Sequence, residues 1–217
     1  MPVKVGLQYI EIWQESMEDA IRAYEQEPLH KGQIVFYGPS YFTRWCERYG
    51  MTPMREVLLG KSGAPCVVNR GFGSSSAEHQ LYYYARAVRP LEPKVLVYNF
   101  FANGPSFGYS DEESWELAQR VIAWARTDFP GIRIYLMGPQ KSVENSPEKL
   151  ESMRRCSAWV KEFAENTPNC FFLDTMDYAP LDRTDIFVED GVHFNQKGYR
   201  IYGEYFKEAL KEELDQF

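Results

Sequence analysis

Three residues of this chain have the chemistry of a nucleophile and its base. Ser40 follows a Gly-Pro corner at the end of an apolar run, where its hydroxyl and backbone N–H would be accessible. Asp190 precedes His193 by three positions, so its carboxylate can orient the imidazole. A serine hydroxyl needs an adjacent base, and an imidazole held in one tautomer by a carboxylate is such a base. A capping role for Ser40 or His193 stays open, because serine and histidine are both frequent helix caps.

Small residues at Gly71–Ser74 follow a second apolar run, and they predict a loop whose backbone N–H groups can approach an oxyanion closely. The same residues are also ordinary turn formers. The segment Gly60–Ser62 ends like a phosphate-binding loop, but Arg55 stands where that motif needs glycine. A nucleotide site is therefore not expected there. The Gly-x-Ser-x-Gly turn of α/β-hydrolases does not surround Ser40.

Short apolar runs and helical patterns predict the elements that must position these residues. Five runs predict buried strands at Gln33–Tyr37, Cys66–Asn69, Lys94–Tyr98, Ile132–Met137 and Cys170–Asp174. Apolar residues at helical spacing predict helices over Trp13–Tyr24, from the capping box Ser110/Glu113 to Ala125, from Ser146-Pro147 to Ala164, and over Tyr199–Leu210.

Nearly continuous apolar strands that alternate with helices predict a parallel sheet covered on both faces. We expect an α/β fold, a three-layer α/β/α sandwich of flavodoxin-like type with a five-stranded parallel sheet, forming a single domain over residues 1–217. In such sheets, ligands bind beyond the carboxyl ends of the strands. Ser40, Gly71–Ser74 and Asn99–Gly104 all follow predicted strands, so they should meet at that edge.

Composition limits the classes of partner. The chain has 24 Lys and Arg against 31 Asp and Glu, a formal net charge of −7, which disfavours nucleic acid and anionic membranes. A secretory segment and a run of about 20 apolar residues are both lacking, so we expect a soluble, cytoplasmic protein without membrane insertion. The four cysteines have no Cys-x-x-Cys spacing, and we expect free thiols, no metal site and no cofactor.

In order and spacing, these segments resemble the conserved blocks of the GDSL/SGNH hydrolase family. Residues 34–40 resemble the first block, 67–74 the second, 95–103 the third and 190–199 the last, so that the resemblance spans residues ~10 to 210. It implies a serine enzyme that hydrolyses esters and needs no cofactor or metal.

The resemblance also implies a role for each matching residue. Ser40 would be the nucleophile, and Asp190 and His193 would be its acid/base pair. The oxyanion hole would consist of the backbone N–H groups of Ser40 and Ser74 and the side chain of Asn103.

Two positions and one block depart from the family pattern. Pro39 replaces the aspartate of Gly-Asp-Ser, Ser74 stands where the family has glycine, and the third block lacks Gly-x-Asn-Asp. Asn99 is therefore an alternative to Asn103 in the oxyanion hole. We favour Asn103, because it lies in a loop that can turn its carboxamide toward the nucleophile, whereas Asn99 directly follows a strand and should be fixed by packing.

The sequence thus predicts an esterase or acylhydrolase that acts through an acyl-enzyme. Aromatic residues beside the blocks, among them Tyr41, Phe72 and Phe101, predict a ring-lined pocket for a short acyl group on a sugar or other small alcohol. One alternative is a catalytically impaired relative that binds carbohydrate or another ligand. A second is a flavodoxin-like module that binds phosphate through Ser40 and the glycine-rich loop, with no role for the Asp/His pair.

Overall fold

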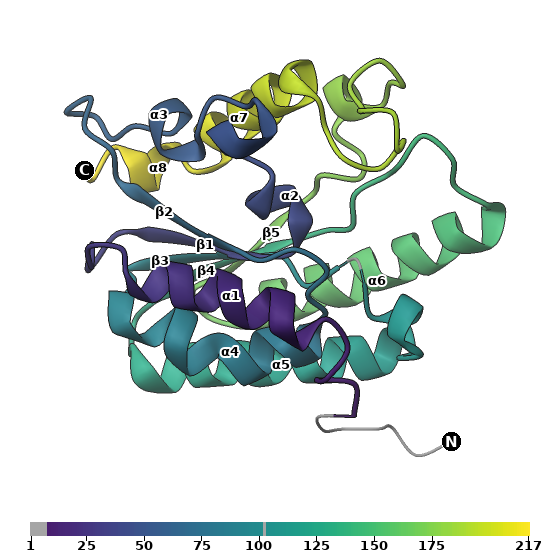
Figure 1. Ribbon diagram of the computed structural model, residues 1–217, viewed down its shortest axis with the longest axis horizontal. Helices are drawn as coiled ribbons and strands as arrows, with labels where there is room; N and C mark the ends of the chain where they lie inside the picture. Colours follow the sequence, from purple (N-terminus) through teal and green to yellow (C-terminus); the bar gives the residue numbers. More distant parts are fainter. Residues whose placement is uncertain (1–7, 102) are drawn as a thin grey trace.

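The computed structural model describes residues 8–101 and 103–217, and its centre is one sheet of five parallel strands. The strand order is β2-β1-β3-β4-β5, with β1 paired to both β2 and β3 (Figure 1). The strands are β1 (Ile34–Gly38), β2 (Val67–Gly71), β3 (Val95–Tyr98), β4 (Arg133–Met137) and β5 (Cys170–Leu173). All five predicted strands are confirmed, and none of their ends differs from the expected one by more than two residues.

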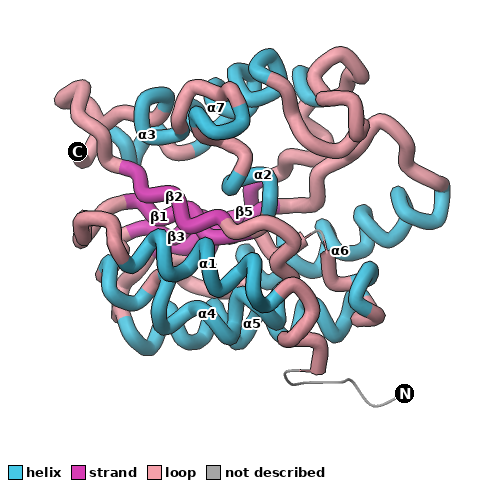
Figure 2. The backbone as a smooth tube through the Cα atoms, viewed as in Figure 1, coloured by secondary structure: helices cyan, strands magenta, loops and turns pink. Residues whose placement is uncertain are grey.

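Helices cover both faces of the sheet, as Figures 1 and 2 show. One face carries α1 (Gln14–Glu25), α4 (Ala77–Ala87), α5 (Asp111–Asp128) and α6 (Pro147–Glu165). The other carries α2 (Ser40–Thr43), α3 (Met54–Val57), α7 (Gln196–Ala209) and α8 (Lys211–Leu214). Single 3₁₀ turns are η1 (Glu47–Tyr49), η2 (Arg89–Leu91), η3 (Pro105–Phe107) and η4 (Ala179–Leu181). The predicted three-layer α/β/α sandwich is confirmed.

Alternation along β1, an interior strand, shows how the sheet divides the core into two apolar clusters. Val35 and Tyr37 of β1 face the α1/α4/α5/α6 layer, whereas Ile34 and Phe36 face the α2/α3/α7/α8 layer. All four side chains are fully buried. Successive side chains of a strand point to opposite faces, so a strand that is covered on both sides must be apolar throughout.

The predicted helix starts are confirmed at α5 and α6. The Ser110 hydroxyl accepts from the backbone N–H of Glu113, whose carboxylate accepts in turn from the Ser110 N–H, and Ser146 caps α6 through the N–H of Lys149. Helix α4 was not among the expected elements. Its first turns bury the polar residues Glu78, His79 and Gln80, which hides the apolar period that would have predicted it.

Two paired glycines bring α2 directly onto the end of the sheet. Gly38 and Gly71 are register partners at the carboxyl ends of β1 and β2. A Cβ at Gly71 would lie 2.5 Å from Phe42 Cβ and from the Thr43 backbone nitrogen, and a Cβ at Gly38 would lie 2.7 Å from the Asn99 carbonyl oxygen. Such approaches exclude any side chain at either position. The helix that begins at Ser40 therefore rests on these two strand ends.

Two further expectations concern cysteines and membranes. The four cysteines are free thiols, three of them buried and Cys46 partly buried, as expected. Among the helices in residues 8–101 and 103–217, none is long and apolar enough to cross a membrane.

Candidate active site

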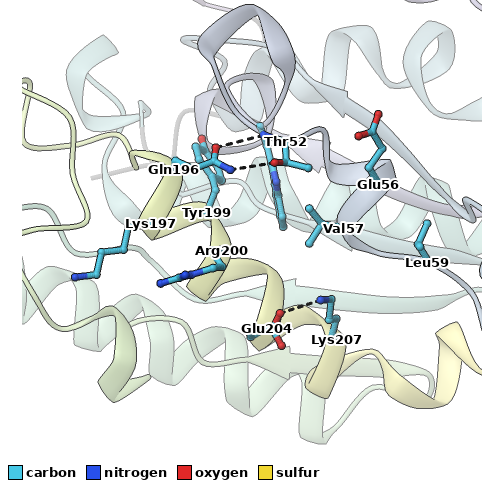
Figure 3. Close-up of a pocket in the computed structure, with 11 residues that line it drawn as sticks. Thr52, Glu56, Val57, Leu59, Gln196, Lys197, Tyr199, Arg200, Glu204 and Lys207 are labelled. Atoms are coloured by element: carbon cyan, nitrogen blue, oxygen red, sulfur yellow. Dashed lines mark hydrogen bonds and ion pairs between the residues drawn. The ribbon is translucent and has the colours of Figure 1, made fainter.

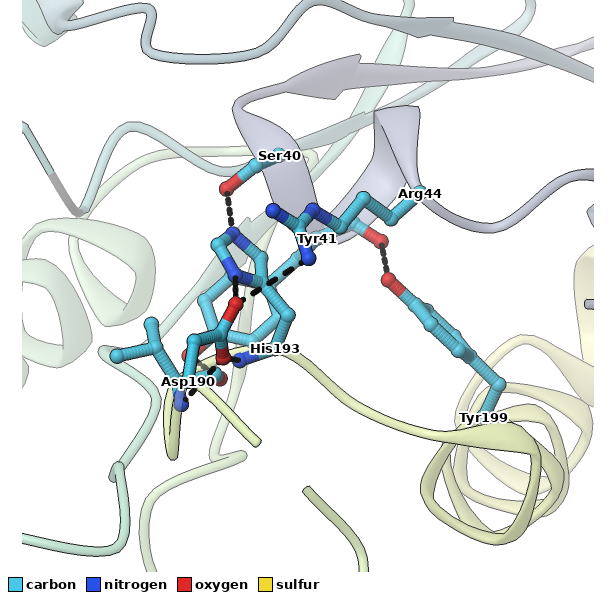
Figure 4. Close-up of polar contacts among 7 residues, drawn as sticks. Ser40, Tyr41, Arg44, Asp190, His193 and Tyr199 are labelled. Atoms are coloured by element: carbon cyan, nitrogen blue, oxygen red, sulfur yellow. Dashed lines mark hydrogen bonds and ion pairs between the residues drawn. The ribbon is translucent and has the colours of Figure 1, made fainter. Parts of the chain in front are cut away.

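Ser40 is the first residue of α2 and lies just beyond the carboxyl end of β1. The extended backbone of Pro39 precedes it and turns the chain from strand to helix. Its Oγ lies 2.8 Å from Nε2 of His193, which is 153 positions further along the chain (Figure 4). The fold therefore brings the predicted nucleophile within hydrogen-bonding distance of its predicted base.

The segment 186–195 carries Asp190 and His193, the predicted acid/base pair, and is anchored at both ends. The Val188 N–H donates to the His193 carbonyl at 2.8 Å, and the Asn195 N–H donates to the Ile186 carbonyl at 2.9 Å. Asn195 also caps α7, because its Oδ1 accepts from the N–H groups of Lys197 and Gly198. The motif that contains Asp190 and His193 is thus a closed loop leading into a capped helix.

Asp190 orients the imidazole from within this loop. Its Oδ2 accepts from His193 Nδ1 at 2.7 Å, while its Oδ1 accepts from the backbone N–H groups of Val192 and His193, both at 2.9 Å. With the proton held on Nδ1, Nε2 presents its lone pair to the Ser40 hydroxyl. This arrangement can remove the hydroxyl proton during attack.

The protonation states fit that chemistry. Burial raises the pKa of Asp190, but the backbone hydrogen bonds from His193 and Val192 and the imidazole outweigh burial and lower this pKa to about 2. Burial is also the largest influence on His193, and it lowers the imidazole pKa below its ordinary value of 6.5, although the bond to Asp190 raises it. At neutral pH the pair is therefore a carboxylate beside a neutral imidazole.

Two tyrosine hydroxyls and one arginine join α2 to the base loop and α7. The Tyr41 hydroxyl donates to the Val192 carbonyl at 3.0 Å, and the Tyr199 hydroxyl donates to the Tyr41 carbonyl at 2.9 Å. Arg44 Nη1 lies 3.2 Å from Asp190 Oδ2 (Figure 4). Reasoning from the sequence missed Arg44, although its position four residues after Ser40 places both on one helix face.

The predicted oxyanion residues lie near the nucleophile on neighbouring loops. Ser74 is exposed and has a φ of 61°, a left-handed conformation that glycine adopts without strain. Asn103 lines the same pocket as Ser40, and its Nδ2 donates to the Ser75 carbonyl at 2.9 Å. Asn99 is 1% exposed and does not line this pocket.

The pocket beside Ser40 has a volume of about 570 Å³. Of the three aromatic residues expected in its wall, Tyr41 and Phe101 line it, but Phe72 does not. Phe72 is fully buried under the sheet against Tyr37 and Tyr83, because it follows the last residue of β2 and points into the core. Most of the remaining wall is polar, and its hydroxyl and amide side chains include Ser16, Ser74, Ser106, Ser114, Gln140, Ser142 and Ser152.

A larger hollow of about 890 Å³ lies elsewhere, between α3 and α7 (Figure 3). Thr52 and Gln196 are hydrogen-bonded across it, and Lys207 pairs with Glu204 at 2.8 Å. None of the predicted catalytic residues lines it.

Within the described ranges, 8–101 and 103–217, no three His, Cys, Asp or Glu side chains are grouped so that they could hold a metal ion.

The model of the GDSL-like lipase/acylhydrolase family matches residues 36–201. The match covers most of the chain, including Ser40, Gly71–Ser74, Asp190 and His193. The chain therefore belongs to this family and is a hydrolase of ester bonds.

Solved structures share the fold at low sequence identity. A GDSL-like lipase from Bacteroides thetaiotaomicron has 17% identity and a TM-score of 0.67, with 93% of this chain and 98% of that chain covered. An acetylxylan esterase from Geobacillus stearothermophilus has 16% identity and a TM-score of 0.65, with 87% of this chain and 99% of that chain covered. A further acetyl xylan esterase has 20% identity and a TM-score of 0.66, with 82% of this chain and 99% of that chain covered. Among curated proteins, none is significantly similar in sequence.

Proposed function

We propose that the chain is a serine esterase in which Ser40 is the nucleophile, His193 the general base and Asp190 the residue that orients the base. One observation carries the proposal: His193 lies between the other two, 2.8 Å from Ser40 Oγ and 2.7 Å from Asp190 Oδ2. Both distances are those of strong hydrogen bonds.

The reaction has two halves. His193 Nε2 takes the Ser40 proton while Oγ forms a bond to the ester carbonyl carbon, and the resulting imidazolium returns that proton to the leaving alcohol as the ester C–O bond breaks. Water then attacks the acyl-enzyme, again losing a proton to His193. The carboxylic acid is released and the Ser40 hydroxyl is restored. Asp190 stabilises the imidazolium in both halves.

The negative charge on the carbonyl oxygen needs donors in both tetrahedral intermediates. We assign them to the N–H groups of Ser40 and Ser74 and to the Asn103 carboxamide. The Ser40 N–H is the first of α2, and an N–H at that position has no carbonyl partner within the helix. The Asn103 carboxamide carries two N–H hydrogens, and its bond to Ser75 occupies one of them.

The pocket supports a short acyl group on a sugar or another small polyol. Its wall contains several serine hydroxyls and the Gln140 amide, which match the donors and acceptors of a polyhydroxylated alcohol. Phe101, which is partly exposed, adds a ring that can pack on the apolar face of a sugar. The acetyl xylan esterases with this fold act on esters of that kind, as their names state.

The first test is hydrolysis by the purified protein. The rate on p-nitrophenyl acetate and on an acetylated monosaccharide should exceed that on p-nitrophenyl octanoate, because the largely polar pocket wall offers few apolar contacts to an octanoyl chain. Ser40→Ala provides the background rate. A wild-type rate equal to the Ser40→Ala rate on every ester would favour a ligand-binding relative without catalytic activity.

A further inference from the structure

Arg44 occupies a position that links the nucleophile to its base. It is the C-terminal cap of α2, four residues after Ser40, so both side chains leave the same face of the helix. Its guanidinium lines the catalytic pocket and reaches Asp190 Oδ2, 146 positions further along the chain (Figure 4). The pair therefore connects the helix that begins at the nucleophile with the loop that carries the base.

The contact completes the hydrogen bonding of the Asp190 carboxylate. Oδ1 accepts from two backbone N–H groups of its own loop, and Oδ2 accepts from His193 Nδ1 and from Arg44 Nη1. A carboxylate offers about four acceptor sites, and here all of them are used. Three donors come from the loop itself, so Arg44 is the only donor among these four that ties the carboxylate to another element.

Arg44 also opposes the charge that His193 acquires during the reaction. Burial lowers the imidazole pKa most, the Asp190 carboxylate raises it, and the Arg44 guanidinium lowers it further. The other charged groups lining the pocket are already paired or hydrogen-bonded: Asp111 of α5 with Arg155, and Lys149 of α6 with the Ser142 hydroxyl. The side chains of Tyr41 and Tyr49 also line the pocket.

We propose that Arg44 is a positioning residue for ester hydrolysis: it fixes the Asp190 carboxylate, and through it the His193 ring, relative to Ser40. This inference rests on the proposed serine-esterase function. The Arg44 and Asp190 side chains are 31% and 40% exposed, and ion pairs that exposed contribute little to folding. Loss of Arg44 should therefore change catalysis more than stability.

The test compares Arg44→Gln with Arg44→Lys. In Arg44→Gln, kcat on p-nitrophenyl acetate at about pH 8 should fall roughly tenfold, with little change in KM or in the melting temperature, because the reacting groups lose alignment while binding is kept. Removing the guanidinium also raises the His193 pKa, and only neutral His193 can accept a proton. The acid limb of kcat/KM should therefore move to higher pH. Arg44→Lys should restore the acid limb and only part of kcat.

Arg48→Gln is the matched control. Arg48 stacks on the same Tyr49 ring as Arg44, but no hydrogen bond or ion pair joins it to the base loop in the described part of the chain. This variant removes one positive charge four residues away, and it should keep both the wild-type kcat and the wild-type pH profile.

Three results would overturn the inference. The first is a wild-type kcat and pH profile in Arg44→Gln. The second is a rise in KM with unchanged kcat in Arg44→Gln, which would make Arg44 a substrate-binding residue. The third is a loss of kcat in Arg48→Gln equal to that in Arg44→Gln. If Arg44→Gln does not fold, Arg44→Lys decides: full wild-type kcat would contradict the need for the guanidinium geometry. Failure of the esterase function itself would appear differently, as wild-type activity no higher than that of Ser40→Ala.

Discussion

The two rims of the catalytic pocket are built differently. The catalytic rim, which we define as residues 40–44 and 186–195, is cross-linked between elements by the contacts of Ser40, Tyr41 and Arg44 with the base loop. The opposite rim, residues 100–101, 103–108 and 139–145, contacts neighbouring segments at separate points, such as Asn103 to the Ser75 carbonyl and the Val143 N–H to the Gly191 carbonyl. Its turn at Ser142–Asn145 is held chiefly by its own hydrogen bonds.

This difference follows from what each rim has to do. Proton transfer between Ser40 and His193 requires both groups within hydrogen-bonding distance, and an error of 1 Å can cost about a hundredfold in rate. Recognition of the alcohol depends on several weaker contacts, each of which can be replaced. We therefore expect substitutions in the catalytic rim to abolish turnover and those in the opposite rim to change substrate preference.

The largest effect should come from the reacting pair. Ser40→Ala and His193→Ala should each lower kcat on p-nitrophenyl acetate on the order of 10⁵–10⁶-fold, and the double variant should be scarcely worse than either single one, because the residues act as a unit. The melting temperatures should stay close to that of the wild type. Additive losses in the double variant would mean that the two residues act separately.

Asp190→Asn should cause the second-largest loss of kcat. An amide can no longer hold the proton on His193 Nδ1, so kcat should fall by about 10⁴-fold. The amide Oδ1 can still accept from the N–H groups of Val192 and His193, which should preserve the loop. A circular-dichroism spectrum of an unfolded chain would instead make Asp190 a structural residue.

Asn103 should have an intermediate effect, since one lost oxyanion donor typically costs 10²–10³ in rate, or about 3–4 kcal/mol. Asn103→Ala should lower kcat by that amount with little change in melting temperature. Asn99→Ala is the contrasting variant: its side chain is buried away from the pocket, so it should lower the melting temperature and leave kcat near the wild-type value. The reverse outcome would assign the donor to Asn99.

The catalytic rim could be predicted from the sequence because its chemistry is concentrated in short segments. Ser40 follows a strand, Asp190 and His193 form one short motif, and the resemblance of both segments to GDSL/SGNH blocks predicted that they act together. The opposite rim could not be predicted in this way. Its residues lie in loops whose path depends on packing, as the fully buried Phe72 also illustrates on the neighbouring loop. Arg44 was missed because its partner lies 146 positions away.

The smallest effect is expected at Gln140 in the opposite rim. Its side chain is partly exposed and lines the pocket. Gln140→Ala should raise KM for an acetylated monosaccharide by about 3–10-fold, the value of one hydrogen bond, and leave p-nitrophenyl acetate unaffected. Gln119→Ala, outside this pocket, is the control. Equal effects on both esters would mean that Gln140 does not contact the alcohol.

The most direct test of the central claim is covalent labelling with a fluorophosphonate, which reacts with serine hydroxyls activated by a base. Peptide mass spectrometry should find one adduct, on Ser40, and labelling should be much slower in His193→Ala and absent in Ser40→Ala. An unlabelled wild-type protein would contradict the claim, and so would an adduct on another serine of the pocket, such as the exposed Ser74.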